Sequence, residues 1–247
     1  MRTKKKLITI LILSGAVSIS LPHAVRAGGP PPSAAGAATI KGVVHLEGSA
    51  PAAKVISMAA DPSCAKQHPS PVLTQEVMAD AKGELQNVIV FVSEGLGDRT
   101  FEPPSEPVVI DQKGCLYLPH VMAVRANQRV QVVNDDPTSH NIHPIPVNNR
   151  EWNKAEPPGS KMEDTFAREE IAIPVKCNVH PWMRGYVAVF KHPYFAVTGK
   201  DGRFDLSSLP PGTYTIKAWH EKLGTSTQTV TLAANESRDL NFVFKGK

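Results

Sequence analysis

Short runs of β-branched and aromatic residues, separated by Pro, Gly and Asn, recur along most of this chain. Val121–Arg125, Arg129–Asn134 and Gly185–Phe190 have the composition and length of strands, and Thr213–Trp219 alternates apolar and polar residues. No amphipathic helix longer than about three turns stands out at the helical period. Because 41% of the residues are hydrophobic, the chain is not disordered. The sequence therefore predicts an all-β protein made of sandwiches or barrels.

The N-terminus has the three parts of a secretory signal peptide. Arg2 and Lys4–Lys6 precede an apolar run from Leu7 to Ile19, and a small-residue cleavage site ends at Ala27. The run is too short for a membrane span. Cleavage removes five basic residues and no acidic ones, so the formal charge falls from +4 to −1. We therefore expect a periplasmic or secreted protein that binds no nucleic acid and has no membrane span in its mature form.

One segment carries the donor atoms of a metal site. Cys177, His180 and Met183 follow one another at intervals of three residues, between two predicted strands. A tight loop turns a thiolate, an imidazole and a thioether toward one point, and this donor set suits copper in both oxidation states. Upstream, a predicted strand is followed by His140 and His143, either of which can supply a second imidazole.

These two segments resemble the cupredoxins of the amicyanin type, whose ligand loop has the same Cys-x2-His-x2-Met spacing. The resemblance covers residues 116–189 and implies a Greek-key β-sandwich with one type 1 copper ion. The ligands that it implies are His140, Cys177, His180 and Met183. It favours His140 over His143, because His140 occupies the His-Asn position of the family. It also implies that Asn141 ties its loop to the cysteine loop and that the Asn178 amide donates to the sulfur.

A second resemblance covers residues 195–244. A turn at Lys200–Arg203 and a Pro-Pro-Gly turn at 210–212 are similar to those of the carboxypeptidase regulatory-like, transthyretin-like β-sandwich. The first strands of that module are missing just before this region, whereas Thr39–Leu46 and Leu85–Val92 look like them. We therefore expect the cupredoxin to be inserted into a sandwich whose strands come from both ends of the chain.

The predicted domain organisation follows from these two resemblances. It comprises a signal peptide (1–27), a Pro/Gly/Ala linker (28–38), an N-terminal β segment that completes the C-terminal sandwich (39–104), a cupredoxin domain (105–192) and a carboxypeptidase regulatory-like β-sandwich (193–247). Residues 144–162 carry too many Pro, Asn and Gly residues for regular structure, so we expect a long irregular loop there.

Two cysteines remain beside the predicted ligand. In an oxidising compartment, Cys64 and Cys115 are expected to form a disulfide. The alternative is a second metal site made by Cys64, His68, Cys115 and His120, for which separate segments have to converge.

The sequence predicts a type 1 copper protein that transfers single electrons between redox partners and is not an enzyme. His180, framed by Pro181 and Trp182, is expected at the surface as the electron exit toward a redox protein. Two alternatives stay open. One is a copper-binding or trafficking protein without electron transfer. The other is a module whose second sandwich binds a cell-wall or polysaccharide surface.

Overall fold

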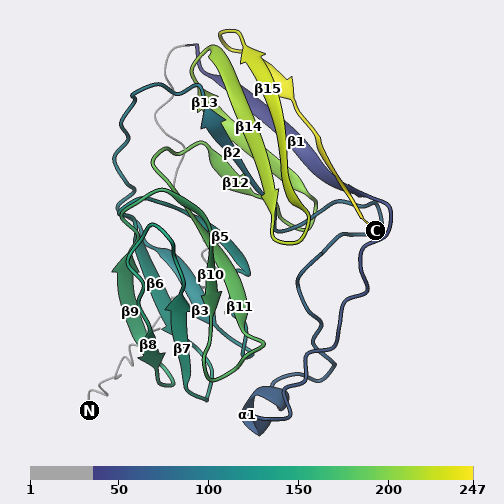
Figure 1. Ribbon diagram of the computed structural model, residues 1–247, viewed down its shortest axis with the longest axis vertical. Coiled ribbons are helices and arrows are strands. Elements are labelled where there is room, and N and C mark those ends of the chain that lie inside the picture. The colour runs from purple at the N-terminus through teal and green to yellow at the C-terminus, as the bar shows by residue number, and fades with distance from the viewer. Residues whose placement is uncertain (1–35, 247) are drawn as a thin grey trace, which may run out of the picture.

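The computed structural model describes residues 36–246, which form two β-sandwiches (Figure 1). The predicted signal peptide and most of the predicted linker lie outside the described residues. In the described part, strands dominate and the single helix is α1 (Pro62–Ala65). The prediction of an all-β fold with two sandwiches is therefore confirmed.

The first sandwich contains the predicted metal ligands. One sheet has the strand order β5-β11-β10-β7-β8, and the other has the order β4-β3-β6-β9. Their bounds are β3 (Val108–Gln112), β4 (Tyr117–Leu118), β5 (Val121–Arg125), β6 (Arg129–Asn134), β7 (His140–Pro144), β8 (Lys154–Glu156), β9 (Lys161–Thr165), β10 (Glu170–Lys176) and β11 (Arg184–Phe190). Strands β5 and β6, and later β9 and β10, are consecutive in sequence but lie in opposite sheets, so the chain crosses repeatedly between the two sheets.

Alternating side chains form the core of this sandwich. In β6, Val130 and Val132 are fully buried whereas Arg129 is exposed. Because successive strand residues point to opposite faces, this alternation directs one side of the strand toward the opposing sheet. Strands β5 and β6 begin and end at the predicted residues.

The segment expected to be an irregular loop, residues 144–162, contains regular structure. Strand β8 pairs with β7, and β9, which begins inside this segment, pairs with β6. These are short strands at the edges of their sheets, and residues alternate between exposed and half-buried in β9. Edge strands of this kind take their hydrogen bonds from a neighbour and need no apolar run of their own. The prediction was therefore wrong for residues 144, 154–156 and 161–162.

The second sandwich combines strands from before and after the first one in sequence. Its bounds are β1 (Ala38–Glu47), β2 (Ile89–Glu94), β12 (Phe195–Val197), β13 (Arg203–Leu209), β14 (Gly212–His220), β15 (Gly224–Leu232), β16 (Ser237–Asp239) and β17 (Phe242–Lys245). Strand β1 pairs with β13, β16 and β17, and β2 lies between β12 and β14. Neither N-terminal strand pairs with a strand of the first sandwich.

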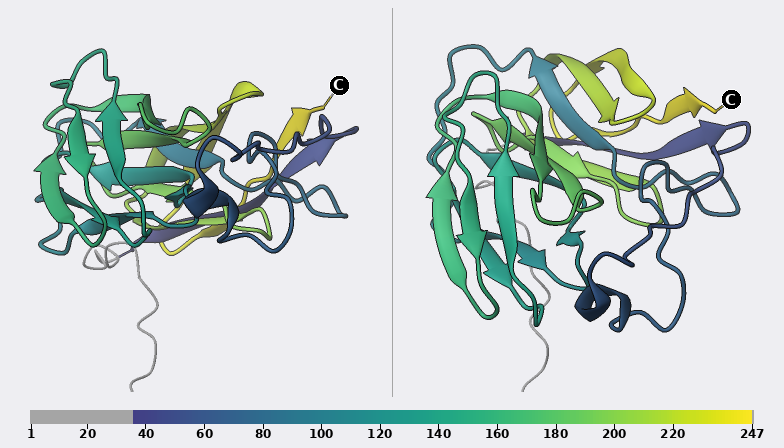
Figure 2. Two further views of the ribbon diagram at one scale, coloured as in Figure 1. Left: turned by 90° about the horizontal axis from the view of Figure 1, so that it is seen from below. Right: turned by 60° about the horizontal axis from the view of Figure 1, so that its bottom comes forward.

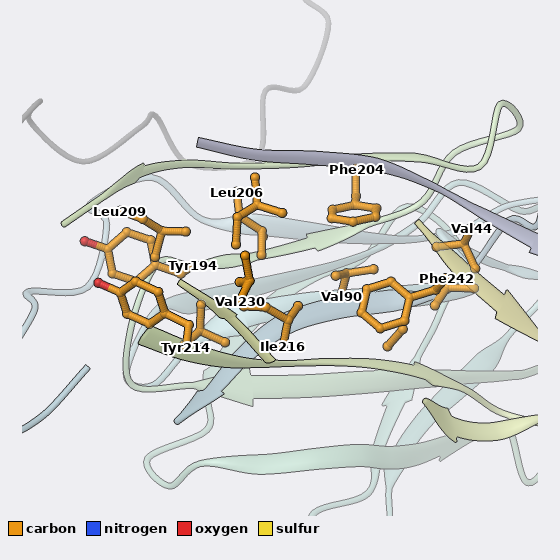
Figure 3. Packing of buried hydrophobic residues seen from close by; sticks show 14 of the residues in the cluster. Val44, Val90, Tyr194, Phe204, Leu206, Leu209, Tyr214, Ile216, Val230 and Phe242 are labelled. Carbon is orange, nitrogen blue, oxygen red and sulfur yellow. The ribbon is translucent and has the colours of Figure 1, made fainter. Parts of the chain in front are cut away.

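Aromatic and aliphatic side chains fill the space between the two sheets of the second sandwich (Figure 3). Tyr194, Tyr214 and Leu209 gather at one end of this core, and Phe242 and Val44 lie at the other. The hydroxyl of Tyr214 donates to the carbonyl of a neighbouring turn at 2.6 Å. The buried tyrosine therefore keeps a hydrogen-bond partner while its ring contributes apolar area.

The two sandwiches share a small apolar cluster. The ring of Phe190 at the end of β11 lies 5.0 Å from that of Phe91 in β2 and 4.7 Å from that of Phe195 in β12. At the same boundary, His120 of the first sandwich contacts Glu221, which follows β14, and both side chains are buried. These contacts fix one sandwich against the other.

Residues 48–88, which we call the cap segment, connect β1 to β2. This segment leaves the second sandwich and carries α1 to the first one (Figures 1 and 2). There, Cys64 forms a disulfide with Cys115. Met58 and Cys64 are buried in the core cluster of the first sandwich. Two segments that are far apart in the sequence thus meet at one end of this sandwich.

Among residues 36–246, no helix is long and apolar enough to cross a membrane.

Candidate metal centre

The loop between β10 and β11 brings three of the predicted ligands together. The Cys177 N–H donates to the carbonyl of Met183 (3.1 Å), and the Met183 N–H donates to the carbonyl of His180 (2.9 Å). The His180 N–H also donates to Cys177 Sγ at 3.3 Å. These bonds close the seven-residue loop on itself. Cys177, His180 and Met183 are all at most 2% exposed.

The fourth predicted ligand, His140, approaches from the start of β7. The ligand atoms of His140, Cys177 and His180 all lie within 4.8 Å of one another. Nδ1 of His180 is 2.8 Å from Nδ1 of His140 and 3.9 Å from Sγ of Cys177. Met183 is buried in the same core cluster as Cys177. The two imidazoles and the sulfur therefore converge on one enclosed point.

The remaining ring nitrogens of the two histidines face carboxylates. Nε2 of His140 is 2.8 Å from Asp136 Oδ2. Nε2 of His180 is 3.0 Å from Asp61 Oδ2. An ionised carboxylate only accepts hydrogen bonds, so each Nε2 carries a proton. If both imidazoles are neutral, the lone pairs of the two Nδ1 atoms then face each other across 2.8 Å and repel. A cation between them, either a proton or a metal ion, removes this repulsion.

Hydrogen bonds set the charge of these groups. Burial opposes ionisation of Cys177, but hydrogen bonds from His140 and from the loop backbone outweigh it and lower the pKa of the thiol, which favours the thiolate. Burial also opposes protonation of His140, but its bonds to Asp136 and Cys177 raise its pKa to about 9. Burial raises the pKa of Asp136, but its hydrogen bonds lower it by more, so the net pKa is below the usual value. The site is therefore built from anions around two imidazoles.

These residues fit a copper ion. Nitrogen and sulfur donors bound to one ion at about 2.0 and 2.3 Å lie no more than about 4.3 Å apart. The observed spacing of 3.9 Å between Cys177 Sγ and His180 Nδ1 meets that limit. A thiolate, two imidazoles and a buried thioether form a donor set suited to both oxidation states of copper.

Asn141 links the two ligand-bearing segments. Its Oδ1 accepts the N–H of Asn178 at 2.6 Å and lies 3.4 Å from Cys177 Sγ. The expectation that the Asn178 amide donates to the sulfur was wrong, because this amide points to Asn141. The backbone N–H that donates to the sulfur belongs to His180, where the loop turns back over Cys177.

The structure places His143 outside this cluster. Its Nδ1 is 3.2 Å from Asn178 Oδ1, and its Nε2 is 2.7 Å from Glu151 Oε1, so both ring nitrogens have other partners. His143 lies three residues beyond His140 in the same strand, and its ring is close to the ligand loop without joining its donor atoms.

Cys64 and Cys115 are bonded to each other, with their Cα atoms 5.6 Å apart. Their sulfurs are therefore not available for the alternative metal site. His68 and His120, the other two residues of that alternative, face different atoms: His68 Nε2 lies 2.7 Å from the carbonyl of Gly114, and His120 contacts Glu221.

His180 does not reach the surface, although it was expected there. It is 2% exposed, because the cap segment covers it. Cys64 Sγ lies 3.7 Å from His180 Nε2, and Trp182 packs its ring 5.0 Å from the imidazole. The half-buried Trp182 is therefore closer to solvent than the histidine that it covers.

The sequence reasoning missed the two carboxylates of this site. Asp136 lies four residues before His140, a spacing that is visible in the sequence but is not specific. Asp61 is 119 positions from His180, and no local pattern identifies it. Only the path of the cap segment brings Asp61 to this site.

Comparisons with known proteins give one match to a family model and several similarities to solved structures. Residues 186–245 match the carboxypeptidase regulatory-like domain. The chain is also similar in structure to a purple cupredoxin from Nitrosopumilus maritimus, with 27% identity over 34% of this chain and 97% of that chain and a TM-score of 0.29. A Cu(I) form of an amicyanin mutant shows 21% identity over 40% of this chain and 97% of that chain, with a TM-score of 0.31.

A copper-containing nitrite reductase from Thermus scotoductus SA-01 shows 22% identity over 40% of this chain, with a TM-score of 0.33. The similar region spans only 25% of that enzyme. No curated protein sequence matches this chain. The assignment of individual ligands therefore depends on the geometry described above.

Proposed function

We propose that this protein is an extracytoplasmic type 1 copper protein that transfers single electrons between redox partners and catalyses no reaction of its own. One observation carries the proposal. The Nδ1 atoms of His140 and His180 face each other at 2.8 Å beside Sγ of Cys177, while both Nε2 atoms are bonded to carboxylates. Such a set of buried, convergent donors is what a soft cation requires.

Each residue has a separate role in this proposal. His140, Cys177 and His180 would hold the ion, with Met183 supplying a thioether. Bound copper would supply one-electron chemistry between Cu(I) and Cu(II). Asn141 keeps the two ligand-bearing segments together, and the closed loop from Cys177 to Met183 limits their movement. A donor set that is already assembled needs little rearrangement when the charge at its centre changes.

Trp182 offers a route from this centre to solvent. Its ring is 5.0 Å from that of His180, and its Nε1–H donates to the carbonyl of Cys115 at 3.1 Å. Pro181 and Val179 beside it are exposed. We therefore place the contact with a redox protein on the surface around Trp182, since weak redox encounters need only small patches.

The domain division is part of the same proposal. The pairing of β1 and β2 with C-terminal strands supports a cupredoxin domain (105–192) inserted into a carboxypeptidase regulatory-like sandwich that is built from residues 39–104 and 193–247. A cleaved signal peptide at 1–27 would deliver the protein to the periplasm or the exterior.

The test is spectroscopic. The mature protein is loaded with Cu(II), and its visible absorption and EPR spectra are recorded beside those of Cys177→Ser and His143→Asn. An intense thiolate-to-copper absorption band with small copper hyperfine splitting is expected for the wild type. Cys177→Ser should lose both features, because the thiolate supplies the absorption.

His143→Asn is the matched control. His143 lies beside the loop but has both ring nitrogens engaged elsewhere, so the variant should keep the band. Electron transfer through a type 1 site would be refuted if the wild type showed weak absorption and broad hyperfine splitting and Cys177→Ser showed the same spectra. Readily exchangeable copper would then indicate trafficking. Retention on polysaccharide that persists in Cys177→Ser would indicate a surface-binding module.

A further inference from the structure

We propose that Asp61 is a positioning residue for the His180 imidazole, delivered to the site by the cap segment and held there by the Cys64–Cys115 disulfide. The proposal rests on the metal site described above and adds a residue from outside the first sandwich. Its consequence is that the cap segment takes part in setting the copper affinity and the reduction potential.

The Asp61 carboxylate has a different partner set on each oxygen. Oδ1 accepts the backbone N–H and the hydroxyl of Ser63 at 2.8 and 2.6 Å. Oδ2 accepts the hydroxyl of Thr138 at 3.0 Å and the Nε2–H of His180 at 3.0 Å. One carboxylate therefore joins the start of α1, the segment before β7 and the ligand loop.

The local backbone also fixes the position of this carboxylate. Asp61 is the N-cap of α1, so its backbone is fixed by the helix turn that its own side chain closes. The residue therefore reaches His180 as an oriented acceptor.

The disulfide anchors this turn to the first sandwich. The Cys64 N–H donates to the carbonyl of Asp61 at 3.1 Å, and Cys64 is covalently joined to Cys115. The N–H of Cys115 in turn donates to Asp136 Oδ2 at 2.7 Å, and Asp136 holds His140. The two carboxylates that face the two imidazoles are therefore connected through one disulfide.

A carboxylate on Nε2 has two effects on a ligating imidazole. It fixes the ring with Nδ1 directed at the metal, and it makes that nitrogen a stronger donor. Negative charge near the ion favours Cu(II) over Cu(I). Loss of Asp61 should therefore weaken Cu(II) binding more than Cu(I) binding and raise the reduction potential.

The experiment compares Asp61→Asn with Asp80→Asn in the full chain. Asp80 lies in the same cap segment, next to Ala79, which packs against the core of the second sandwich. It closes a turn by accepting the N–H groups of Lys82 and Glu84, both at 2.8 Å. Cu(II) affinity is measured by competition with a chelator, and the reduction potential is measured by redox titration. We expect Asp61→Asn to lose 10- to 100-fold in Cu(II) affinity, as is usual for partners of metal-ligating histidines.

The potential provides a second reading. A tenfold change in the ratio of Cu(II) to Cu(I) affinity corresponds to about 59 mV for one electron. The potential of Asp61→Asn should therefore rise by about that amount for each tenfold loss of Cu(II) affinity that Cu(I) affinity does not share. Asp80→Asn should match the wild type in both measurements. Cys64→Ala/Cys115→Ala should shift in the same direction as Asp61→Asn, because it frees the turn that carries Asp61.

Two outcomes overturn the proposal. One is an Asp61→Asn protein whose affinity and potential equal those of the wild type. The other is an equal shift in Asp80→Asn, which would indicate general loosening of the cap segment. NMR of the metal-free protein distinguishes this failure from that of the proposed function. It reports the His180 tautomer and the Nε2–H bond even if the wild type shows no thiolate-to-copper band. An unchanged tautomer in Asp61→Ala, which removes the acceptor, would also refute the role.

Discussion

Two buried histidines away from the candidate metal centre should make the protein less stable in mild acid. His192 follows β11 and is 8% exposed, and His220 ends β14 and is 1% exposed. Nδ1 of His192 accepts the backbone N–H of Tyr194 at 3.2 Å. Nδ1 of His220 accepts the N–H groups of residues 222 and 223 at 3.1 and 3.3 Å. Protonation of either Nδ1 breaks these bonds and places a cation in the core.

The free energy follows from the difference in proton binding between the folded and unfolded chains. Burial, together with the Arg125 cation, lowers the pKa of His192 from 6.5 to about 4. Burial likewise lowers the pKa of His220 to about 4. Between pH 6.5 and 4 the unfolded chain binds protons that the folded chain does not, so stability is full above this window and falls as the pH drops through it. Each histidine should cost about 2 kcal/mol between pH 7 and pH 5.

Urea unfolding of the metal-free protein at several pH values between 7 and 5 tests this calculation. In His192→Asn and His220→Asn, the side-chain oxygen can still accept the local N–H but does not titrate in this range. Near pH 5, the slope of the unfolding free energy against pH should be smaller in each variant than in the wild type, by about 1.2 kcal/mol per pH unit. The two losses should add, because the residues share no contact. Slopes equal to that of the wild type would show that both histidines are already protonated in the folded state.

Three further changes probe the fold by unfolding measurements. Cys64→Ala/Cys115→Ala should lower the unfolding free energy by about 4 kcal/mol, because the disulfide closes a loop with a sequence separation of 51; an unchanged midpoint in urea would contradict the bond. Phe190→Ala should cost about 3–5 kcal/mol, since its ring is fully buried between the sandwiches, and a loss below about 1 kcal/mol would mean that they do not pack there. Gly42→Ala should destabilise the second sandwich, because a Cβ at this position would lie 1.9 Å from the Leu240 carbonyl oxygen; wild-type stability would argue against this close approach of β1 to the chain before β17.

The fold class was predictable because the signal is local. Strands such as 121–125 and 129–134 carry their own alternation, so their positions follow from the sequence. Strands β8 and β9 carry no such apolar pattern. Their positions are set by hydrogen bonds to the neighbouring strands β7 and β6. The same division applies to the site. The loop that contains Cys177, His180 and Met183 is one short segment whose spacing alone brings the side chains together.

Contacts between distant segments decide what the sequence pattern does not. Asp61 lies in a polar stretch with many prolines and has no recognisable motif, and only the path of the cap segment brings it to His180. The same path explains why His180 is buried instead of exposed. A pattern of ligands predicts the donor set, whereas the surroundings of that set depend on which remote segment covers it.

The second sandwich contributes to the candidate metal centre through this cover. The cap segment begins at the end of β1 and ends at the start of β2, and both strands are paired inside the second sandwich. Its middle is joined to the first sandwich by the disulfide. A long loop that is fixed at both ends and at one internal point has less conformational entropy than a free tail. It therefore loses less entropy when it covers a site. Strands from both ends of the chain therefore do more than complete a separate domain, because they hold the ends of the segment that places Asp61 against His180 and excludes solvent from the imidazole.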